Sequence, residues 1–477
     1  MTTTFAADRI APGPTSWMPG SHFLKFRRDP LTFFTTIART YGDVVRFTFG
    51  SQPVYLVSHP DMIEDVLVTS SKKFMKGIAL QRAKRLLGEG LLTAEGQLHL
   101  RQRRTIQPLF HKQQVQRFAE AMVRHAVRWR EAVRDGATID LTAEMGGLTL
   151  AIVGETLFST NVQSDADEVR EALSDAVQSF AYAVLPYVEL IEKLPVGPFV
   201  KVRKARARLD RVILRVITER RASPDTGQDL VSMLLAARDP ENPTEPGMSD
   251  RQIRDEAMTI FLAGHETTAN ATSWTWHLLG EAPAAESRLH EELDRVLAGR
   301  IPAIEDVPKL EYTRAVIAES MRVYPPAWTM GRRVIEPHTI GGYSIEKNAL
   351  VLLSQWVVHR DPRWWSEPES FKPERWLASD GIREPGAGNR EPGAGSPAIG
   401  SRIPDPGSRP RYAYFPFGGG NRVCIGESFA WTEAILLLAA IAQRWKFVPV
   451  SKPVPEPRIT LRPAQLEMRA ARRNAKV

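Results

Sequence analysis

The sequence predicts one large, mainly helical fold of the α+β class, with small β-sheets toward both ends of the chain. Three observations support this prediction. Helical patterning extends from Pro60 to about residue 300, and strand patterning occurs both before and after it. The strands do not alternate with helices, which excludes a sheet built from βαβ units. The length of 477 residues is compatible with one large domain, although it would also allow about three domains.

Composition limits the classes of function. The chain has 63 Lys and Arg residues against 55 Asp and Glu, a net charge of +8, and the basic residues are spread along it. This distribution does not indicate a nucleic-acid partner, and an acidic protein partner suits it at least as well. The single cysteine, Cys424, excludes an internal disulfide and a cysteine-rich zinc site. It leaves a buried core residue, a reactive thiol or a single thiolate ligand of a metal.

The beginning of the chain is rich in proline and glycine, and residues 1–40 are predicted to form an arm on the body of the protein. The first residues lack the basic and apolar segments of a signal peptide. No run of 18 apolar residues predicts a membrane span. We therefore expect a cytoplasmic protein.

The elements follow in order. Asp43–Phe49 and Pro53–Val57 predict a hairpin around Gly50. The helical region is interrupted near residues 88–90, 135–136, 195–198, 223–227 and 239–247. Strand patterning returns at Thr339–Ile345 and Leu350–Ser354, and a last helix is predicted near Gly426–Arg444.

Residues 380–411 differ in composition from the rest of the chain. Arg383-Glu-Pro-Gly-Ala-Gly388 recurs as Arg390-Glu-Pro-Gly-Ala-Gly395, and proline and glycine dominate up to Pro410. Such a segment buries too little apolar area to offset the entropy of ordering it. We predict a disordered surface insert.

One long helix contains an unusual turn. Ser249 and Gln252 form the pattern of a capping box, and helical patterning continues from there to Gly280. Ala263 and Gly264 within it are followed by His265, Glu266 and Thr267. Glycine at this position indicates either close helix packing or the approach of a flat molecule to the backbone. A threonine hydroxyl there can also bond the carbonyl one turn earlier.

Cys424 lies in a glycine-rich frame, Phe417-Gly-Gly-Gly-Asn-Arg-Val-Cys424-Ile-Gly426, just before the last predicted helix. The glycines allow a tight turn, and a helix N-terminus stabilises a thiolate. A thiolate held in this way can serve as the axial ligand of a haem iron. Arg422 could reach an anionic group of the same cofactor.

These motifs resemble those of the cytochrome P-450 family. Phe417-x-x-Gly420-x-Arg422-x-Cys424-x-Gly426 is similar to its haem-binding signature, and Ala263-Gly264-x-Glu266-Thr267 to its oxygen-activation segment. Glu319-Ser-Met-Arg322 resembles its Glu-x-x-Arg pair, and Pro373-Glu-Arg375-Trp376 the segment that joins that pair, where phenylalanine is the commoner last residue. The resemblance extends from about Pro12 to beyond Leu461. It implies a haem-thiolate domain over residues 41–477 that contains the insert.

The resemblance also implies roles for individual residues. Cys424 would bind the iron of haem b, Phe417, Gly418, Ala263 and Gly264 would lie beside the cofactor, and Glu319, Arg322 and Arg375 would form a buried structural network. The haem propionates would bind His99, Arg103, Arg422 and Arg332, with Arg333 as the alternative to Arg332. Many members of the family carry tryptophan in place of His99. Thr267 would hydrogen-bond iron-bound oxygen, and Glu266 would help to relay protons.

The implied activity is a monooxygenase that inserts one oxygen atom from O2 into an apolar small molecule, such as a fatty acid, terpenoid or steroid. Aromatic residues at 180, 182, 187 and 328 fall where the family places its pocket. No flavin or nicotinamide motif is present, so electrons would come from a ferredoxin or flavodoxin. Arg101, Arg103, Arg104, Lys112 and Arg117 offer a basic surface for such a partner. We expect a monomer. The alternatives are a peroxide-driven or isomerising haem-thiolate enzyme, a haem sensor or electron carrier, and a thiol-nucleophile enzyme.

Overall fold

The computed structural model describes residues 9–15, 18, 20–158, 197–222, 229–244, 246–377 and 409–473. The chain divides into two compact units. The first, here called the sheet unit, comprises residues 1–82, 322–370 and 408–424. The second, the helix unit, comprises residues 83–321, 371–407 and 425–477.

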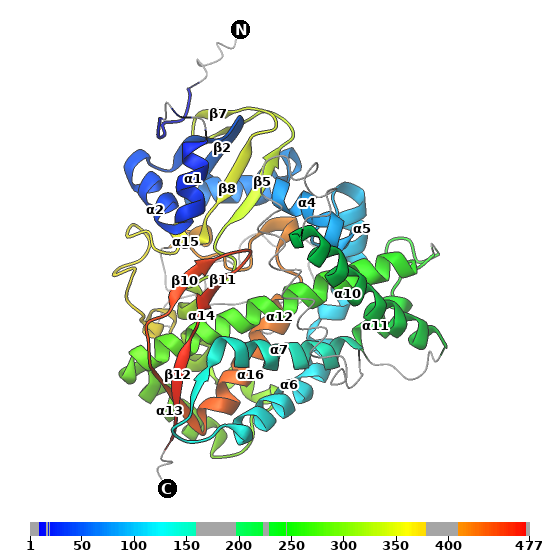
Figure 1. Ribbon diagram of the computed structural model, residues 1–477, viewed down its shortest axis with the longest axis vertical. Helices are drawn as coiled ribbons and strands as arrows, with labels where there is room; N and C mark the ends of the chain where they lie inside the picture. The colour runs from blue at the N-terminus through cyan, green and yellow to red at the C-terminus, as the bar shows by residue number, and fades with distance from the viewer. Residues whose placement is uncertain are drawn as a thin grey trace. The chain divides into compact units, whose positions relative to one another are not determined.

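The sheet unit is built on a five-stranded sheet with the order β1-β2-β8-β5-β3 (Figure 1). Its strands are β1 (Val44–Phe49), β2 (Gln52–Val57), β3 (Phe74–Lys76), β5 (Met330–Val334) and β8 (Leu350–Leu353). The predicted hairpin is confirmed, since β1 and β2 pair antiparallel from Val44 opposite Val57 to Phe49 opposite Gln52. β3 and β5 were not predicted from the sequence.

Two elements of the sheet unit differ from expectation. The segment predicted as one strand at 339–345 is a small hairpin of β6 (His338–Ile340) and β7 (Tyr343–Ile345). Gly341 and Gly342 turn the chain between them with φ angles of 58° and 83°, which favour glycine. The segment predicted as an arm contains two helices, α1 (Ser21–Arg28) and α2 (Pro30–Tyr41). The Asp29 side chain caps α2 by accepting a hydrogen bond from the Thr32 amide at 3.0 Å.

The remaining helices of the sheet unit are short. They are α3 (Pro60–Glu64), the π-helical turn Asp65–Thr69, α15 (Gln355–Val358) and the 3-10 turns Ser71–Lys73, Arg411–Ala413 and Gly420–Arg422. The core of the unit is apolar and includes Val57, Phe74, Val351 and Phe415. α4 (Ile78–Leu87) begins in the sheet unit and ends in the helix unit, and α14 (Glu311–Val323) does the reverse.

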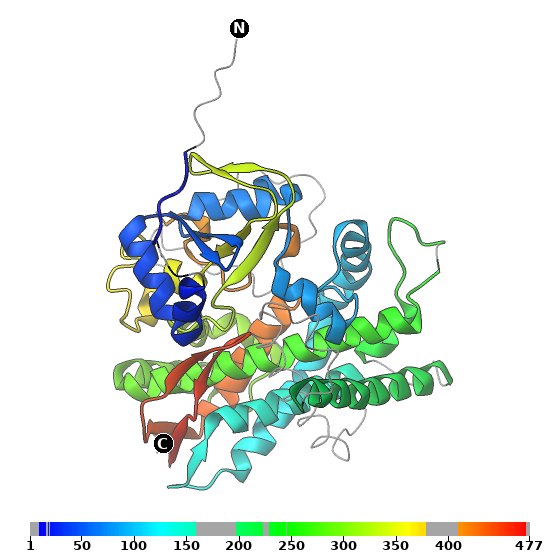
Figure 2. The same cartoon turned by 45° about the horizontal axis from the view of Figure 1, so that its top comes forward.

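The helix unit contains most of the helices. They are α5 (Gly96–Ile106), α6 (Lys112–Ala132), α7 (Leu141–Phe158), α10 (Gly197–Ala222), α11 (Leu230–Ala236), α12 (Asp250–Glu281), α13 (Pro283–Leu297) and α16 (Glu427–Ala442). α12 packs against α7, α10 and α16, and Figure 2 shows α7 and α10 running beside it. The predicted last helix is confirmed by α16.

α12 begins where the sequence predicts. The Ser249 hydroxyl accepts a hydrogen bond from the Gln252 amide, and the Gln252 side chain accepts one from the Ser249 amide at 2.9 Å. Both halves of the capping box are therefore present. Pro283 starts the next helix, α13, so the break after Gly280 is also confirmed.

Small sheets complete the helix unit. β4 (Thr138–Asp140), β12 (Glu467–Arg472) and β9 (Trp445–Pro449) form one sheet, and β10 (Val454–Pro457) pairs with β11 (Leu461–Ala464). These short strands confirm the mainly helical fold with small sheets. In the described part of the chain, no helix combines the length and apolar character needed to span a membrane.

Some predictions fall outside the described residues. These are the breaks at 195–196 and 223–227, the aromatic residues at 180, 182 and 187, and the insert up to residue 408. They remain predictions.

Candidate functional site

The middle of α12 is more exposed than the turns on either side of it. Leu262 and Thr268 are buried, whereas Ala263 between them is exposed and residues 264–267 are half-buried. A methyl group added at Gly264 would lie 3.5 Å from the nearest atom, Cγ2 of Val153 in α7, which is ordinary contact. Helix packing therefore does not require glycine at this position. The exposed turn favours the other interpretation, approach of a molecule to the backbone.

The hydroxyl group of Thr267 is held by the same turn. Its Oγ1 donates a hydrogen bond to the carbonyl oxygen of Ala263 at 2.7 Å. The single hydroxyl hydrogen is therefore used by the backbone, and the oxygen presents lone pairs to any bound group. This is the bond to the preceding turn that the sequence allowed.

Glu266 lies beside Thr267 but is held from a different element. Its Oε1 accepts a hydrogen bond from the Thr460 hydroxyl at 2.6 Å, and Thr460 lies between β10 and β11. Burial raises the pKa of Glu266, while the Thr460 hydroxyl and then Arg462 and Arg458 lower it in part. A carboxyl group with a raised pKa is better suited to taking up a proton than one with an ordinary pKa.

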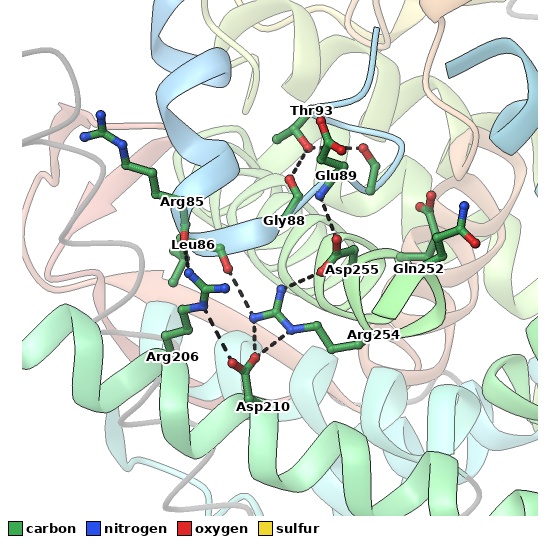
Figure 3. Close-up of polar contacts among 12 residues, drawn as sticks. Arg85, Leu86, Gly88, Glu89, Thr93, Arg206, Asp210, Gln252, Arg254 and Asp255 are labelled. Atoms are coloured by element: carbon green, nitrogen blue, oxygen red, sulfur yellow. Dashed lines mark hydrogen bonds and ion pairs between the residues drawn. The ribbon is translucent and has the colours of Figure 1, made fainter. Parts of the chain in front are cut away.

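The end of α4 and the segment that follows it are tied to the first half of α12 (Figure 3). Arg254 donates from Nε to Asp210 of α10 at 2.6 Å, from Nη1 to Asp255 at 2.8 Å, and from Nη2 to the Leu86 carbonyl at 3.3 Å. Asp255 in turn accepts from the Glu89 amide at 2.8 Å. Arg254 and Asp255 are both buried, so their ion pair is desolvated, whereas the Asp210 side chain is 28% exposed. One arginine therefore links α10, α12 and the 86–89 segment.

Cys424 lies in the sheet unit at the end of a bent loop, and its side chain is exposed. The Cys424 amide donates to the Phe417 carbonyl at 3.0 Å, which closes the loop. Gly420 has a φ of 65°, and a side chain there would lie 2.0 Å from the Leu67 carbonyl oxygen. Gly418 also has a positive φ, 76°. The two glycines therefore determine the backbone conformation of the loop that exposes the thiol.

The arginines predicted to bind a cofactor in the sheet unit differ in their surroundings. Arg422 donates from Nη1 to the Phe74 carbonyl at 3.1 Å. Arg332 and Arg333 are neighbours on β5, so their side chains point to opposite faces of the sheet. Arg332 is buried, whereas Arg333 donates a hydrogen bond from Nη2 to Oδ1 of Asn348 at 2.7 Å. These environments favour Arg332 over Arg333 as the buried cation.

His99 and Arg103 lie one turn apart on α5 in the helix unit. Their spacing of four residues places both side chains on one face of the helix. His99 is buried and Arg103 is half-buried. Both make interactions with the protein.

Glu319 is fully buried and accepts three hydrogen bonds within the helix unit. Oε1 accepts from Arg375 Nε at 2.9 Å and from the Lys372 amide at 3.0 Å, and Oε2 accepts from Trp376 Nε1 at 2.9 Å. A buried carboxylate requires such compensation. Tryptophan in place of the family's commoner phenylalanine therefore adds a hydrogen-bond donor.

Arg322, three residues after Glu319, is also fully buried and belongs to the sheet unit. Its guanidinium group donates to the carbonyl groups of His359 at 2.8 Å, Pro368 at 2.6 Å and Ser370 at 3.0 Å. It also lies over the ring of Trp365. These contacts fix the irregular chain after α15.

Comparison with known proteins identifies the fold that carries these motifs. The sequence matches the family described as cytochrome P450 over residues 11–469. The chain belongs to the cytochrome P450 family. It is 38% identical to cyclooctatin synthase of Streptomyces melanosporofaciens, with 96% of this chain and 94% of that protein covered. It is 32% identical to pentalenene oxygenase of Streptomyces avermitilis, with 93% and 92% covered.

A third relative, cyclooctat-9-en-7-ol 5-monooxygenase of Streptomyces melanosporofaciens, is 35% identical over 92% of this chain and 91% of that protein. This P450 is thus a haem-dependent monooxygenase and an oxidoreductase, as the sequence predicted. Members of the family require O2 and a redox partner. The alternative of a thiol-nucleophile enzyme is not supported.

The residues of the Cys424 loop fit the haem that the family implies. The one thiol of the chain is exposed and stands on a backbone bent by two glycines, one of which lies so close to Leu67 that no side chain would fit. A single thiolate donor suits a haem iron and does not suit a zinc site, which needs more ligands.

Sequence reasoning missed the polar partners of the predicted residues. Thr460 and Asn270, which support Glu266, occur in no motif, and the pairing of Glu319 with Trp376 was not anticipated. Asn270 alone had a local signal, because it lies four residues after Glu266 on the same helix.

Proposed function

We propose that this P450 binds haem b through Cys424 and inserts one atom of O2 into a carbocyclic substrate with electrons from a separate protein. The observation that carries this proposal is the exposed thiol of Cys424 on its glycine-bent loop. The bound haem would supply the activation of O2. The presence of Glu266 and Thr267 favours this reaction over peroxide-driven or isomerising chemistry, for which an acid and alcohol pair is unnecessary.

Thr267 and Glu266 would have distinct tasks. The Thr267 hydroxyl gives its hydrogen to the Ala263 carbonyl, so its oxygen would accept a hydrogen bond from a water molecule beside the cofactor and fix the orientation of that water. Glu266, whose pKa is raised by burial, would take up a proton and release it inward. Ala263 and Gly264 would lie against the cofactor because they carry small or no side chains.

Phe417 and Gly418 would border the haem beside Cys424. His99, Arg103, Arg332 and Arg422 would bind its propionates, since arginine and histidine are suited to carboxylates in a desolvated site. Glu319, Arg322 and Arg375 would have no contact with the reacting atoms. Their buried bonds would maintain the backbone that leads to the Cys424 loop.

The substrate is proposed from the names of the relatives. Cyclooctat-9-en-7-ol and pentalenene are cyclic compounds with carbon–carbon double bonds. We propose a carbocyclic alkene with at most one or two hydroxyl groups, and not a straight-chain fatty acid. Trp328, which is buried in the sheet unit, is the described aromatic residue among those predicted to border the pocket.

The electron donor is proposed to be a ferredoxin or flavodoxin. Part of the predicted basic stretch is already neutralised, because Arg104 pairs with Asp239 at 2.9 Å and with Glu241 at 2.6 Å. Lys112 and Arg117 on α6 are exposed. If this surface binds the donor, reduction should slow as salt concentration rises, and replacing both residues by glutamine should remove much of the salt dependence. Salt-insensitive reduction would contradict this docking surface.

We further propose that residues 41–477 act as one monomeric haem-thiolate domain in the cytoplasm and that residues 380–411 are an insert dispensable for haem binding. Deletion of residues 380–407 should leave the haem spectrum unchanged. Light scattering of the holoprotein should give the mass of one chain.

One spectrum tests the central assignment. Carbon monoxide added to the reduced holoprotein should give the absorption band of a thiolate-ligated haem, and Cys424→Ser should abolish that band. Circular dichroism would show whether the variant remains folded. A thiolate band in the folded variant would overturn the assignment. Titration with carbocyclic alkenes, compared with straight-chain fatty acids, should shift the spin state of the wild-type haem and would test the substrate class.

A further inference from the structure

Three residues on one face of α12 bind the hairpin formed by β10 and β11. Glu266, Asn270 and Trp274 are spaced by four residues, so they lie above one another on the helix. Trp274 Nε1 donates to the Leu461 carbonyl at 3.0 Å, and Asn270 Nδ2 donates to Thr460 Oγ1 at 2.9 Å. Thr460 Oγ1 donates to Glu266 Oε1 at 2.6 Å. The hairpin is thus attached along this face of the helix and reaches as far as Glu266.

The hydrogen bonds have a defined direction. The Thr460 hydroxyl has one hydrogen, and because the Asn270 amide donates to its oxygen, that hydrogen is left to point at Glu266. The distance of 2.6 Å is typical of a hydroxyl bond to a charged carboxylate. Asn270 therefore orients Thr460, and Thr460 holds one oxygen of Glu266.

The surroundings distinguish the two carboxylate oxygens. Thr460 is 5% exposed and Asn270 is 3% exposed. Oε1 of Glu266 is therefore bonded to a buried hydroxyl group, which is itself bonded to a buried amide group. Among the hydrogen bonds of the described residues, none involves Oε2 of Glu266. Fixing Oε1 also fixes the rotamer of the side chain and the position of Oε2, which stays available for proton transfer.

We infer that Thr460 and Asn270 are positioning residues that hold the carboxyl group of Glu266 in the orientation needed to deliver protons. This inference rests on the proposed function, in which Glu266 is the proton donor. Neither residue needs to contact the substrate or the cofactor. Thr460 and Asn270 would affect the reaction only through the carboxyl group of Glu266.

The charges near Glu266 predict how its titration responds. Among the described residues, the charged groups that act on its pKa are Arg462 and Arg458 of the same hairpin. Both are ion-paired with Glu456, Arg458 at 2.9 Å and Arg462 at 2.6 Å. Burial raises the pKa of Glu266, and the Thr460 hydroxyl is the largest opposing influence. Removal of that hydroxyl should therefore raise the pKa of Glu266 further, because the charged form loses a donor.

The test uses holoprotein variants of nearly unchanged shape. Thr460→Val removes the hydroxyl, Thr460→Ser restores it, and Thr275→Val is the matched control, since Thr275 is a buried threonine on α12 that bonds the Ala271 carbonyl. Infrared difference spectra as a function of pH follow the protonated carboxyl band, which Glu266→Gln identifies by its loss. We expect the band to persist to higher pH in Thr460→Val than in the wild type, Thr460→Ser or Thr275→Val.

Substrate turnover gives the second readout. Thr460→Val should lower the product formed per electron pair roughly two- to fivefold and move the optimum of this ratio to higher pH, with substrate affinity and the haem spectrum unchanged. Thr460→Ser should restore both. An unshifted infrared titration with unchanged coupling in folded Thr460→Val would overturn the inference.

The outcomes separate the inference from the proposed function. If Glu266→Gln leaves coupling unchanged, the proton-delivery role of Glu266 is wrong, even if Thr460→Val shifts the infrared titration. If Glu266→Gln uncouples the reaction but Thr460→Val does not, the positioning role is wrong and the proposed function stands. Asn270→Leu provides an independent variant. It should produce a smaller shift in the same direction, because the Thr460 hydroxyl remains but loses its orientation.

Discussion

Trp376 donates a hydrogen bond from its indole Nε1 to Oε2 of Glu319 at 2.9 Å. Glu319 is fully buried, and Arg375 bonds its other oxygen. Phenylalanine, the commoner residue of the family at this position, could not make this bond. The aromatic exchange in this chain therefore adds to the hydrogen bonding of the buried carboxylate.

Trp376→Phe should lower the free energy of unfolding. A hydrogen bond to a buried charged group contributes roughly 1.5–3 kcal/mol. The change is measured from urea denaturation and thermal unfolding of the holoprotein. Trp364→Phe is the matched control, because its indole N–H has no hydrogen-bond partner among the described residues. Equal destabilisation by both variants would indicate that the ring packing matters and the hydrogen bond does not.

Thr267→Ala should uncouple electron consumption from product formation. The variant loses the oxygen that the Ala263 carbonyl holds in place, and we expect roughly a tenfold loss of product per electron pair with peroxide released instead. Product, oxygen consumption and peroxide are measured together. Thr267→Ser keeps the hydroxyl and should retain most of the coupling. Unchanged coupling in Thr267→Ala would show that Thr267 has no role in the reaction.

Arg254→Met should destabilise the protein strongly. Removing the guanidinium group leaves Asp210 and Asp255 without their shared partner, and breaking a buried ion pair typically costs about 3–5 kcal/mol. Hydrogen exchange should also increase at residues 86–89, since Arg254 bonds the Leu86 carbonyl and orients Asp255 toward Glu89. The exposed Arg251 one turn away provides the control variant Arg251→Met. Similar unfolding midpoints for the two variants would contradict this role.

Glu433→Gln should alter the pH dependence of stability. Burial raises the pKa of Glu433 from 4.5 to about 8, and its carboxylate oxygens lack a well-formed hydrogen bond among the described residues, although Thr268 lowers the pKa in part. Because the folded pKa lies above the unfolded one, the folded protein retains this proton where the unfolded chain releases it. The contribution of Glu433 to stability is therefore fully present below about pH 4.5 and is lost between about pH 4.5 and 8.

The contribution of Glu433 to this fall is at most about 1.4 kcal/mol per pH unit. Glutamine cannot ionise, so Glu433→Gln should flatten the decline in unfolding midpoint measured across this range. Glu427, whose pKa burial raises to about 7, contributes in the same direction and should leave a residual slope. A variant with the slope of the wild type would show that Glu433 does not titrate in this window.

Much of the local structure around the candidate site could be predicted from the sequence because its signals are local. The capping box of Ser249 and Gln252 spans three residues, Glu266 and Thr267 are adjacent, and the glycines that bend the Cys424 loop lie within seven residues of the cysteine. In each case the backbone geometry follows from residues in the same turn or the same helix start. The β1–β2 hairpin was predictable for the same reason.

The tertiary structure alone decided which distant groups satisfy the buried polar side chains. Thr460 and Glu266 are separated by 194 residues, and Glu319 and Trp376 by 57. β3 and β5 are short strands whose pairing joins positions about 260 residues apart, such as Phe74 and Val334. Local patterning carries no information about such pairs, because a buried donor or acceptor is satisfied by whichever partner the completed fold brings within hydrogen-bonding distance. The sequence therefore predicted the candidate reacting groups, and the fold determined their distant hydrogen-bond partners.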